Sequence, residues 1–324
     1  MLHKLVYDVA IIGGGPAGLA AALAVSRAHR RAVLFDSGKY RNERAEHAHT
    51  IVGFDGKPPA EIRATAWKEI SAYGYVEKVE RCIETVKSVS SSGNTLFEID
   101  GEWNARKIVL ASGVQDVLPD IPGFADAWGY KIYHCAFCHG HEVSGLRGAI
   151  FGVGSLMPAK MFLNVTTDIA VLLNGESLPT EGPVNDSLVR SIAAMSTAAE
   201  PRVISHAVSH VEMGPTHDRD APLKVHFAGS EQPPIELDFL AYAPRGRART
   251  FGLDVEMAPE NGDVKLTSPF GTTNVPGVYA AGDMAVMAKA VPTALATGMM
   301  AGAGAVHDLT TEDLKDALEA VIEM

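Results

Sequence analysis

A glycine-rich turn near the start of the chain constrains the fold more than any other feature. Residues 13–18 read Gly-Gly-Gly-Pro-Ala-Gly and follow an apolar run, residues 7–12, that has the length of a buried strand. A helix of small residues is expected over 19–28, and a second apolar strand over 31–35 ends at Asp36. Strand, glycine turn, helix, strand and acid is the order found in a dinucleotide-binding βαβ unit.

Each part of this unit has a physical reason. Glycines permit the tight turn and let backbone N–H groups approach a pyrophosphate, while the helix N-terminus adds a partial positive charge. Asp36 is placed to accept a hydrogen bond from a ribose hydroxyl. A glycine pattern alone is weak evidence, but with the strands, the helix and Asp36 in place it predicts a nucleotide site.

The rest of the chain repeats parts of this pattern. A strand is expected over 107–111 and is followed by Ser112 and Gly113, and another over 275–281 leads into Gly282 and Asp283. Residues 148–154 form a second strand and turn, with Gly152 and Gly154 in Gly-x-Gly spacing. Turn residues around Pro119 and Gly123 indicate a crossing between domains.

Less regular segments complete the expected organisation. Polar, Pro- and Gly-bearing residues predict loops over 177–186 and 213–221. Small residues predict a helix over 293–307. An amphipathic segment over 310–324 opens with Thr311-Glu312-Asp313, which resembles a capping box and predicts a new helix start.

These elements predict an α/β fold with two Rossmann-like, doubly wound, three-layer nucleotide-binding domains, the second inserted into the first. Residues 1–116 and 245–324 form the expected first nucleotide-binding domain, and residues 117–244 form the inserted domain. A chain of 324 residues is long enough for two domains of ordinary size.

Charge and composition exclude several classes of protein. The net charge is −11 with no basic block, which disfavours nucleic acid and anionic membrane surfaces as partners. We see no signal peptide and no apolar stretch long enough to cross a bilayer, so we expect a cytoplasmic protein without membrane contact. Three cysteines are too few for a disulfide scaffold.

The sequence His-Cys-Ala-Phe-Cys-His-Gly at residues 134–140 contains a CxxC pair, Cys135 and Cys138. In a cytoplasmic chain such a pair is typically redox-active or metal-binding. Cys-x-x-Cys-His also matches c-type haem attachment, which belongs to exported proteins. A zinc site would need a second pair of ligands at a recognisable spacing, and the sequence shows none.

Histidines surround the pair. His139 follows Cys138 directly, and an imidazole with a pKa of about 6.5 can take and return a thiol proton near neutral pH. His134 and His141 are open between the same role and simple packing or surface positions. His47 and His49 are open between a pocket wall and surface. Cys82 falls in an apparent strand over 79–86 and is interpreted as a small buried hydrophobe.

The blocks described so far together resemble one family. The 13–18 turn, the Ala-Ala-Gly-Asp block at 280–283 and a CxxC in an inserted domain resemble the low-molecular-weight thioredoxin reductases, which are FAD-dependent disulfide oxidoreductases. The segments at 36–42, 55–58 and 135–140 are most similar to the branch of the gliotoxin-type dithiol oxidases, which close disulfides in secondary metabolites. His139 stands where ordinary thioredoxin reductases have Asp.

The resemblance implies FAD as cofactor, a homodimer, and catalysis by Cys135, Cys138 and His139. In the family, the second cysteine faces the flavin and the first exchanges with substrate. The residues that the resemblance places at the cofactor are Gly13, Gly15, Pro16, Ala17, Gly18, Asp36, Ser37, Arg41, Asn42, His49, Gly113, Gly282, Asp283 and Val291. Lys289 and Ala290 depart from the family, where an Arg-Gln pair usually touches flavin.

The second glycine turn bears on the direction of electron flow. Met157 occupies the position where Gly or Ala permits close helix–strand packing, and Glu176 lies where thioredoxin reductases usually carry arginines for the 2′-phosphate of NADPH. We therefore expect a small-molecule dithiol to reduce the disulfide and O2 to accept the electrons as hydrogen peroxide. The alternatives are an NADPH-dependent thioredoxin reductase and a non-catalytic, redox-sensing flavoprotein.

Overall fold

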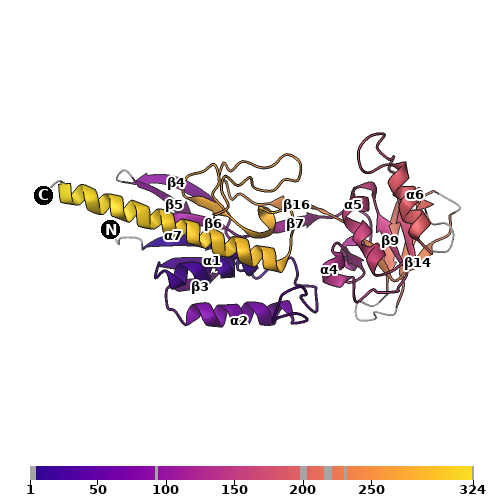
Figure 1. Cartoon of the computed structure of the whole chain (residues 1–324), viewed down its shortest axis with the longest axis horizontal. Helices are drawn as coiled ribbons and strands as arrows, with labels where there is room; N and C mark the ends of the chain where they lie inside the picture. The colour runs from indigo at the N-terminus through magenta and orange to yellow at the C-terminus, as the bar shows by residue number, and fades with distance from the viewer. Residues whose placement is uncertain (1–4, 92–93, 198–202, 215–220, 230–231, 323–324) are drawn as a thin grey trace. The chain divides into compact units, whose positions relative to one another are not determined.

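The computed structural model of the chain describes residues 5–91, 94–197, 203–214, 221–229 and 232–322. The chain divides into two compact units (Figure 1). The first unit consists of residues Met1–Asp116 and Gly246–Met324, and the second of Val117–Arg245. The mixed α/β architecture with parallel sheets confirms the expected fold class.

A seven-stranded sheet forms the centre of the first unit. Its order is β3 (Val76–Glu80), β2 (Ala32–Asp36), β1 (Val6–Ile12), β6 (Trp103–Leu110), β5 (Asn94–Ile99) and β4 (Val86–Ser91). Strands β3, β2, β1 and β6 run parallel, and β4 and β5 form an antiparallel hairpin on β6. Strand β17 (Val278–Ala280) pairs in parallel with the C-terminal half of β6.

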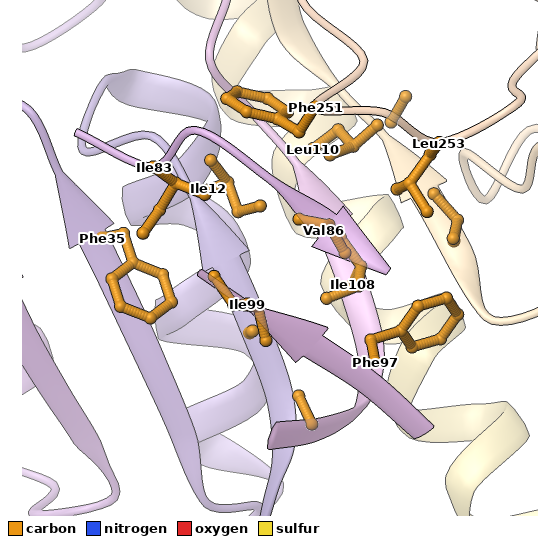
Figure 2. Close-up of a cluster of buried hydrophobic side chains, with 14 of the residues drawn as sticks. Ile12, Phe35, Ile83, Val86, Phe97, Ile99, Ile108, Leu110, Phe251 and Leu253 are labelled. Atoms are coloured by element: carbon orange, nitrogen blue, oxygen red, sulfur yellow. The ribbon is translucent and has the colours of Figure 1, made fainter. Parts of the chain in front are cut away.

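The two faces of this sheet have different covers, because side chains alternate along each strand. Val9 and Ile11 of β1 pack with helices α1 (Pro16–Arg27) and α7 (Val291–Ile322). Ile12, one position on, joins the opposite cluster with Phe97 and Ile99, and Figure 2 shows these side chains in one view with Phe251 and Leu253 of the same cluster. Helix α2 (Pro59–Ser71) contributes Ile70 to the helix side.

Glycines let α7 lie directly against α1, and Figure 1 shows the two helices side by side. A Cβ on Gly298 would stand 2.1 Å from the carbonyl oxygen of Ala17, and one on Gly302 would stand 2.7 Å from that of Ala21. No side chain fits at these two positions without moving backbone. The contact therefore fixes α1, whose N-terminus follows the glycine turn, against the longest helix of the described residues.

The predicted new helix start at Thr311 is wrong, because α7 continues without a break from Val291 to Ile322. The hydroxyls of Thr310 and Thr311 donate to the carbonyl oxygens of Val306 and His307, at 2.8 and 3.0 Å, rather than capping a new helix. Hydroxyls that bond back to the preceding turn are compatible with a helix interior.

Two other local predictions also need correction. The expected strand over 275–281 is shortened to Val278–Ala280. The expected strand over 79–86 is interrupted, since β3 ends at Glu80 and β4 begins at Val86. Cys82 lies in the connection between them and is exposed, so it is not a buried hydrophobe.

The second unit contains a five-stranded parallel sheet in the order β11 (Val203–Ile204), β10 (Ile169–Leu172), β9 (Gly148–Phe151), β15 (Phe239–Ala241) and β8 (Ile132–Tyr133). A three-stranded antiparallel sheet follows, formed by β12 (Val208–Met213), β13 (Leu223–Phe227) and β14 (Ile235–Leu237). Core clusters on both sides of β9 include Phe124 and Phe151 on one side and Phe162 and Phe239 on the other.

The helices of the second unit are short. They are α3 (Phe124–Ala127), α4 (Ala136–His139), α5 (Leu156–Ala159) and α6 (Asp186–Met195), with 3-10 turns at Val153–Ser155 and Lys160–Asn164. Asn185 caps α6 by accepting a hydrogen bond from the N–H of Leu188 at 3.1 Å. Residues 177–185 precede α6 without helix or strand, whereas most of the loop expected over 213–221 lies outside the described residues.

The chain passes between the units twice. The two passages contain strands β7 (Val114–Val117) and β16 (Arg245–Ala248), which pair in a two-stranded sheet. Gly246 allows the close approach, since a Cβ there would lie 3.0 Å from the side chain of Val114. In the ranges that the structure covers, no helix is both long and apolar enough to span a bilayer.

Candidate active site

In the glycine turn at the end of β1, one side packs on neighbouring backbone and the other side, at Gly15, faces open space. A Cβ on Gly13 would lie 2.3 Å from the carbonyl oxygen of Ala111, and one on Gly18 would lie 1.8 Å from that of Gly13. A Cβ on Gly15, by contrast, would meet no atom within 4 Å. Gly13 and Gly18 thus permit close packing of strand, turn and helix, while Gly15 presents bare backbone to open space.

Asp36 ends β2 and faces this turn. A Cβ on Gly14 would stand 2.2 Å from the Asp36 carboxyl carbon, so only glycine fits there. The carboxylate accepts hydrogen bonds from the N–H of Gly38 at 3.0 Å and the hydroxyl of Tyr40 at 2.8 Å, and it pairs with Lys78 at 3.1 Å. Burial raises the pKa of Asp36, but these three donors outweigh burial and hold that pKa below its usual value. Asp36 is therefore an anion near neutral pH.

The residues around the turn fit an FAD pyrophosphate and ribose. Helix α1 begins at Pro16, and its N-cap residue, Gly15, has no side chain that could cap the first N–H groups of the helix. A phosphate is the complement of such a helix end, and the space in front of Gly15 leaves room for it. A carboxylate has about four acceptor positions, of which Asp36 uses three, so one remains for a ribose hydroxyl.

Arg41 joins two acidic residues that are far apart in sequence. Its guanidinium donates to Asp116 in β7, through Nε at 3.1 Å and Nη2 at 2.8 Å, and to Asp283 through Nη1 at 2.9 Å. Burial lowers the pKa of Arg41, but the two carboxylates raise it above its ordinary value. Arg41 therefore ties Asp283 to Asp116, and its expected contact with the cofactor stays a prediction.

Lys289 stabilises the segment of chain that follows Asp283. Its ammonium donates to the Asp263 carboxylate at 2.7 Å and to the carbonyl oxygens of Asp283 at 2.6 Å and Val286 at 3.0 Å. Asp263 is buried, and Lys289 is largely so. The lysine that departs from the family pattern is thus part of the internal support of this loop.

Gly282 and Val291 complete the predicted cofactor residues near α1. Gly282 has a φ of +73°, and a Cβ there would lie 2.8 Å from the Cβ of Ala17. Its N–H donates to the hydroxyl of Thr297 at 3.0 Å. Val291 is the first residue of α7. Gly113 has a φ of +68° and, like Gly15, has no atom within 4 Å of a Cβ.

Ser37, Asn42 and His49 lie in the segment between β2 and α2. Ser37 is exposed, and Asn42 accepts a hydrogen bond from Arg63 at 3.5 Å. The Nδ1 atom of His49 lies 3.4 Å from Asp55. The structure therefore brings five of the predicted cofactor residues together around the start of α1: Gly13, Gly15, Gly18, Asp36 and Gly282. Ser37, Asn42 and His49 lie on the neighbouring segment between β2 and α2.

The second unit contains the cysteine pair. Cys135 and Cys138 are joined by a disulfide with their Cα atoms 5.2 Å apart, at the start of the single turn α4. The N–H groups of Cys138 and His139 both donate to the carbonyl oxygen of Cys135, at 3.2 and 3.1 Å. Gly140 closes the turn, because a Cβ there would lie 2.3 Å from the Ala136 carbonyl oxygen. Both cysteines are half-buried.

Aromatic contacts fix the histidines next to the pair. The imidazole of His139 stacks on the ring of Tyr133, with centroids 4.5 Å apart and an interplanar angle of 17°. His134 lies against Trp128, with centroids 5.8 Å apart. His141 is exposed. The stack fixes the His139 ring against Tyr133. No set of three His, Cys, Asp or Glu suited to a metal ion occurs among the residues described.

The second glycine turn, after β9, repeats only part of the first. The N–H of Gly152 donates to Leu172 at 2.8 Å, as that of Gly13 donates to Phe35 at 2.9 Å. A Cβ on Gly152 would lie 3.2 Å from Glu176 Oε1, so a carboxylate again faces the turn. The helical stretch that follows differs in kind, since only the four residues of α5 are α-helical, between 3-10 turns at Val153–Ser155 and Lys160–Asn164, whereas all twelve residues of α1 are α-helical.

Several supporting residues could not be found from sequence. Lys78 reaches Asp36 from the neighbouring strand β3, and Asp116 and Asp263 pair with cations far along the chain. The guanidinium of Arg63 lies 3.6 Å above the ring of Tyr40, and Tyr133 supports His139. No local pattern marks such residues, because their partners are brought near only by folding.

Comparison with known proteins identifies the family to which the chain belongs. A family model described as pyridine nucleotide-disulphide oxidoreductase matches residues 7–301. Thioredoxin reductase tcpT of Claviceps purpurea is 38% identical over 308 residues, covering 92% of each chain. Thioredoxin reductase sirT of Leptosphaeria maculans is 35% identical over 319 residues, covering 92% of this chain and 93% of its own.

Solved structures agree with these relatives. The crystal structure of HlmI superimposes with a TM-score of 0.85 at 29% identity, covering 100% of this chain and 98% of its own. An oxidoreductase from Agrobacterium tumefaciens gives 0.80 at 31% identity, covering 95% and 99%. The resemblance seen in the motifs is confirmed, including the branch that contains tcpT and sirT. The chain belongs to the pyridine nucleotide-disulphide oxidoreductase family, as a thioredoxin reductase-like, FAD-dependent enzyme.

Proposed function

We propose that this enzyme oxidises a small-molecule dithiol to a disulfide and passes the electrons to O2. The Cys135–Cys138 disulfide supports thiol–disulfide exchange as the chemistry. The observation that supports the proposed direction is the carboxylate of Glu176, which faces the second glycine turn. A carboxylate there repels the 2′-phosphate of NADPH, so the second unit is poorly suited to that donor.

The shape of the second unit supports the same direction. The stretch after the second turn is mostly 3-10 helix, with only the four residues of α5 α-helical, whereas the first turn is followed by the regular twelve-residue α1. Met157 is half-buried at the position where close helix–strand packing needs a small residue. The second unit thus serves here as the carrier of the disulfide.

The cysteines carry out the exchange in two steps. One thiolate of the substrate attacks Cys135, which breaks the Cys135–Cys138 bond and gives a mixed disulfide and a Cys138 thiolate. The second substrate thiol then displaces Cys135, so the substrate loses two electrons and two protons and both cysteines become thiols. The residues around the first glycine turn, with Asp36, would hold FAD, which would supply a two-electron acceptor: two electrons and two protons would pass from this dithiol to O2 as hydrogen peroxide, and the Cys135–Cys138 disulfide would re-form. Each substrate dithiol therefore consumes one O2.

His139 is proposed as the proton carrier for Cys138. The residue follows Cys138 directly, and its stacking on Tyr133 limits the orientations of the imidazole. A neutral imidazole takes the thiol proton, and the imidazolium returns it when the cysteine leaves as a thiol. This role adds to the exchange without changing its electron balance.

The test compares electron donors without oxygen. Flavin-loaded protein is mixed anaerobically with NADPH, NADH or a dithiol, and bleaching of the flavin band is followed. We expect rapid bleaching by the dithiol alone, and, under air, one hydrogen peroxide for each disulfide formed. Cys138→Ser is the control, since it should keep FAD and lose dithiol-driven bleaching. Rapid stoichiometric bleaching by micromolar NADPH would instead establish the alternative, an NADPH-dependent thioredoxin reductase.

Some expectations stay predictions. The assignment of FAD binding to residues 1–116 and 245–324, and of the inserted role to residues 117–244, belongs to this proposal. The same holds for the homodimer and the cytoplasmic location. A redox-sensing module without turnover predicts that dithiols and O2 produce no peroxide, so the assay under air also decides that alternative.

A further inference from the structure

Phe137 lies between the two redox cysteines and points to solvent. Its relative exposure is 67%, whereas Cys135, Ala136, Cys138 and His139 are half-buried. Ala136 packs on the core of the second unit, and His139 on Tyr133. Phe137 is therefore the one side chain of residues 135–140 that the turn presents outward as a large apolar surface.

Phe137 is close in the chain to both cysteines, and therefore to any substrate that exchanges with the Cys135–Cys138 disulfide. Consecutive Cα atoms are about 3.8 Å apart, so Phe137 is directly adjacent to Cys138 and one residue further from Cys135. A substrate sulfur that reaches either cysteine carries its nearest carbon atoms over this turn. The group attached to the sulfur then passes near residue 137, whose ring is exposed.

The surroundings define which group suits this ring. Residues 132–140 contain no Asp, Glu, Lys or Arg, so no fixed charge flanks the cysteines within this segment. An exposed aromatic face gains most from another ring packed edge-on or offset, and from apolar carbon generally. Resting on the proposed function, we propose that Phe137 is a specificity residue that selects uncharged dithiols with an aromatic ring beside the sulfurs.

The test uses two dithiols with the same number of carbon atoms between their sulfurs. Ortho-xylylenedithiol has a benzene ring in that position, and butanedithiol has a flexible chain. Each reduces the protein disulfide by the same balanced exchange, giving a cyclic disulfide and two cysteine thiols. The rate is followed anaerobically in two ways, by flavin bleaching and by quenched alkylation of Cys135 and Cys138 with mass spectrometry. The alkylation reads the cysteines directly and does not depend on O2.

We expect the wild type to react about fivefold to tenfold faster with the aromatic dithiol, the range that one aromatic contact supports. Phe137→Leu keeps apolar bulk and should bring the two rates together, mainly by slowing ortho-xylylenedithiol. Met195→Ala, at another exposed apolar position (59% exposed) on α6, is the matched control and should keep the wild-type ratio.

The outcomes separate this inference from the proposed function. Reduction by both dithiols at equal rates in the wild type, or a ratio that survives Phe137→Leu, would overturn the role of Phe137 and leave the oxidase proposal standing. Failure of both dithiols to reduce the wild-type disulfide would overturn both.

Discussion

Gly15→Ala separates cofactor binding from folding at the first glycine turn. Gly15 has a φ of −77° and a ψ of −177°, a conformation that alanine adopts without strain. A Cβ there meets no atom within 4 Å. Replacing Gly by Ala gains about 0.4–1 kcal/mol through the unfolded chain, and the poorer helix cap costs about 0.5–1 kcal/mol. The two terms nearly cancel, so the FAD-free variant should be as stable as the wild type.

FAD affinity should change far more than stability. The new methyl group fills the open face in front of Gly15, where the backbone is expected to approach the pyrophosphate. We expect the Kd for FAD to rise at least tenfold, which corresponds to about 1.4 kcal/mol. Gly18→Ala is the contrasting variant, because its Cβ would lie 1.8 Å from a backbone oxygen. Such overpacking costs about 1–3 kcal/mol or more in stability, with or without FAD.

Two measurements on the flavin-stripped proteins decide the matter. Urea unfolding followed by circular dichroism gives the stability of each variant, and quenching of flavin fluorescence gives the Kd. An unchanged Kd for Gly15→Ala would refute the assignment of the open face to the pyrophosphate. Loss of stability in Gly15→Ala as large as in Gly18→Ala would refute the reading of that face as unoccupied by protein.

Three further predictions concern other parts of the site. Lys289→Met should lower the unfolding free energy by about 2–4 kcal/mol, because it leaves the buried Asp263 carboxylate unpaired. Adding Asp263→Asn to this variant should recover part of the lost free energy. Urea unfolding measures both changes, and no loss in Lys289→Met would show that the ion pair is dispensable. Cys135→Ser should leave a Cys138 thiolate against the flavin and so show a long-wavelength charge-transfer band, whereas Cys138→Ser should show no such band. The reverse pattern would mean that Cys135 faces the flavin and Cys138 exchanges with the substrate. Burial and the hydrogen bond to Asp36 raise the pKa of Tyr40 to about 12. The stability that this contact provides is therefore complete below about pH 10 and lost as the pH rises through 12. Titration followed by phenolate absorbance should show one late-titrating tyrosine fewer in Tyr40→Phe than in the wild type, and an unchanged titration would contradict this assignment.

The parts of the site that sequence predicts well are local. The glycine turn, Asp36 and the cysteine pair each follow from residues within one βαβ unit or one helical turn, where spacing in sequence fixes spacing in the fold. The first unit accordingly shows β1, the turn, α1 and β2 in the expected order. The class of fold followed from the same reasoning.

The parts that sequence did not predict depend on long-range contacts. Arg41 pairs with Asp116, 75 residues away, and with Asp283, 242 residues away, and no periodicity connects these positions. Helix α7 was expected to restart at Thr311, but tertiary packing through Leu309 and pairing of Glu312 with Lys107 and Arg106 carry it onward. Local capping preferences yield when packing supports a continuous helix.

The paired strands β7 and β16 make the inserted unit a removable cassette. The chain enters this unit through β7 and leaves it through β16, and these two strands are hydrogen-bonded to each other although they are far apart in sequence. A short turn that joins them would therefore replace the unit and leave the sheet order of the first unit intact. In evolution, exchange of this cassette offers a route by which one flavin scaffold acquires a different thiol chemistry without rebuilding its own core.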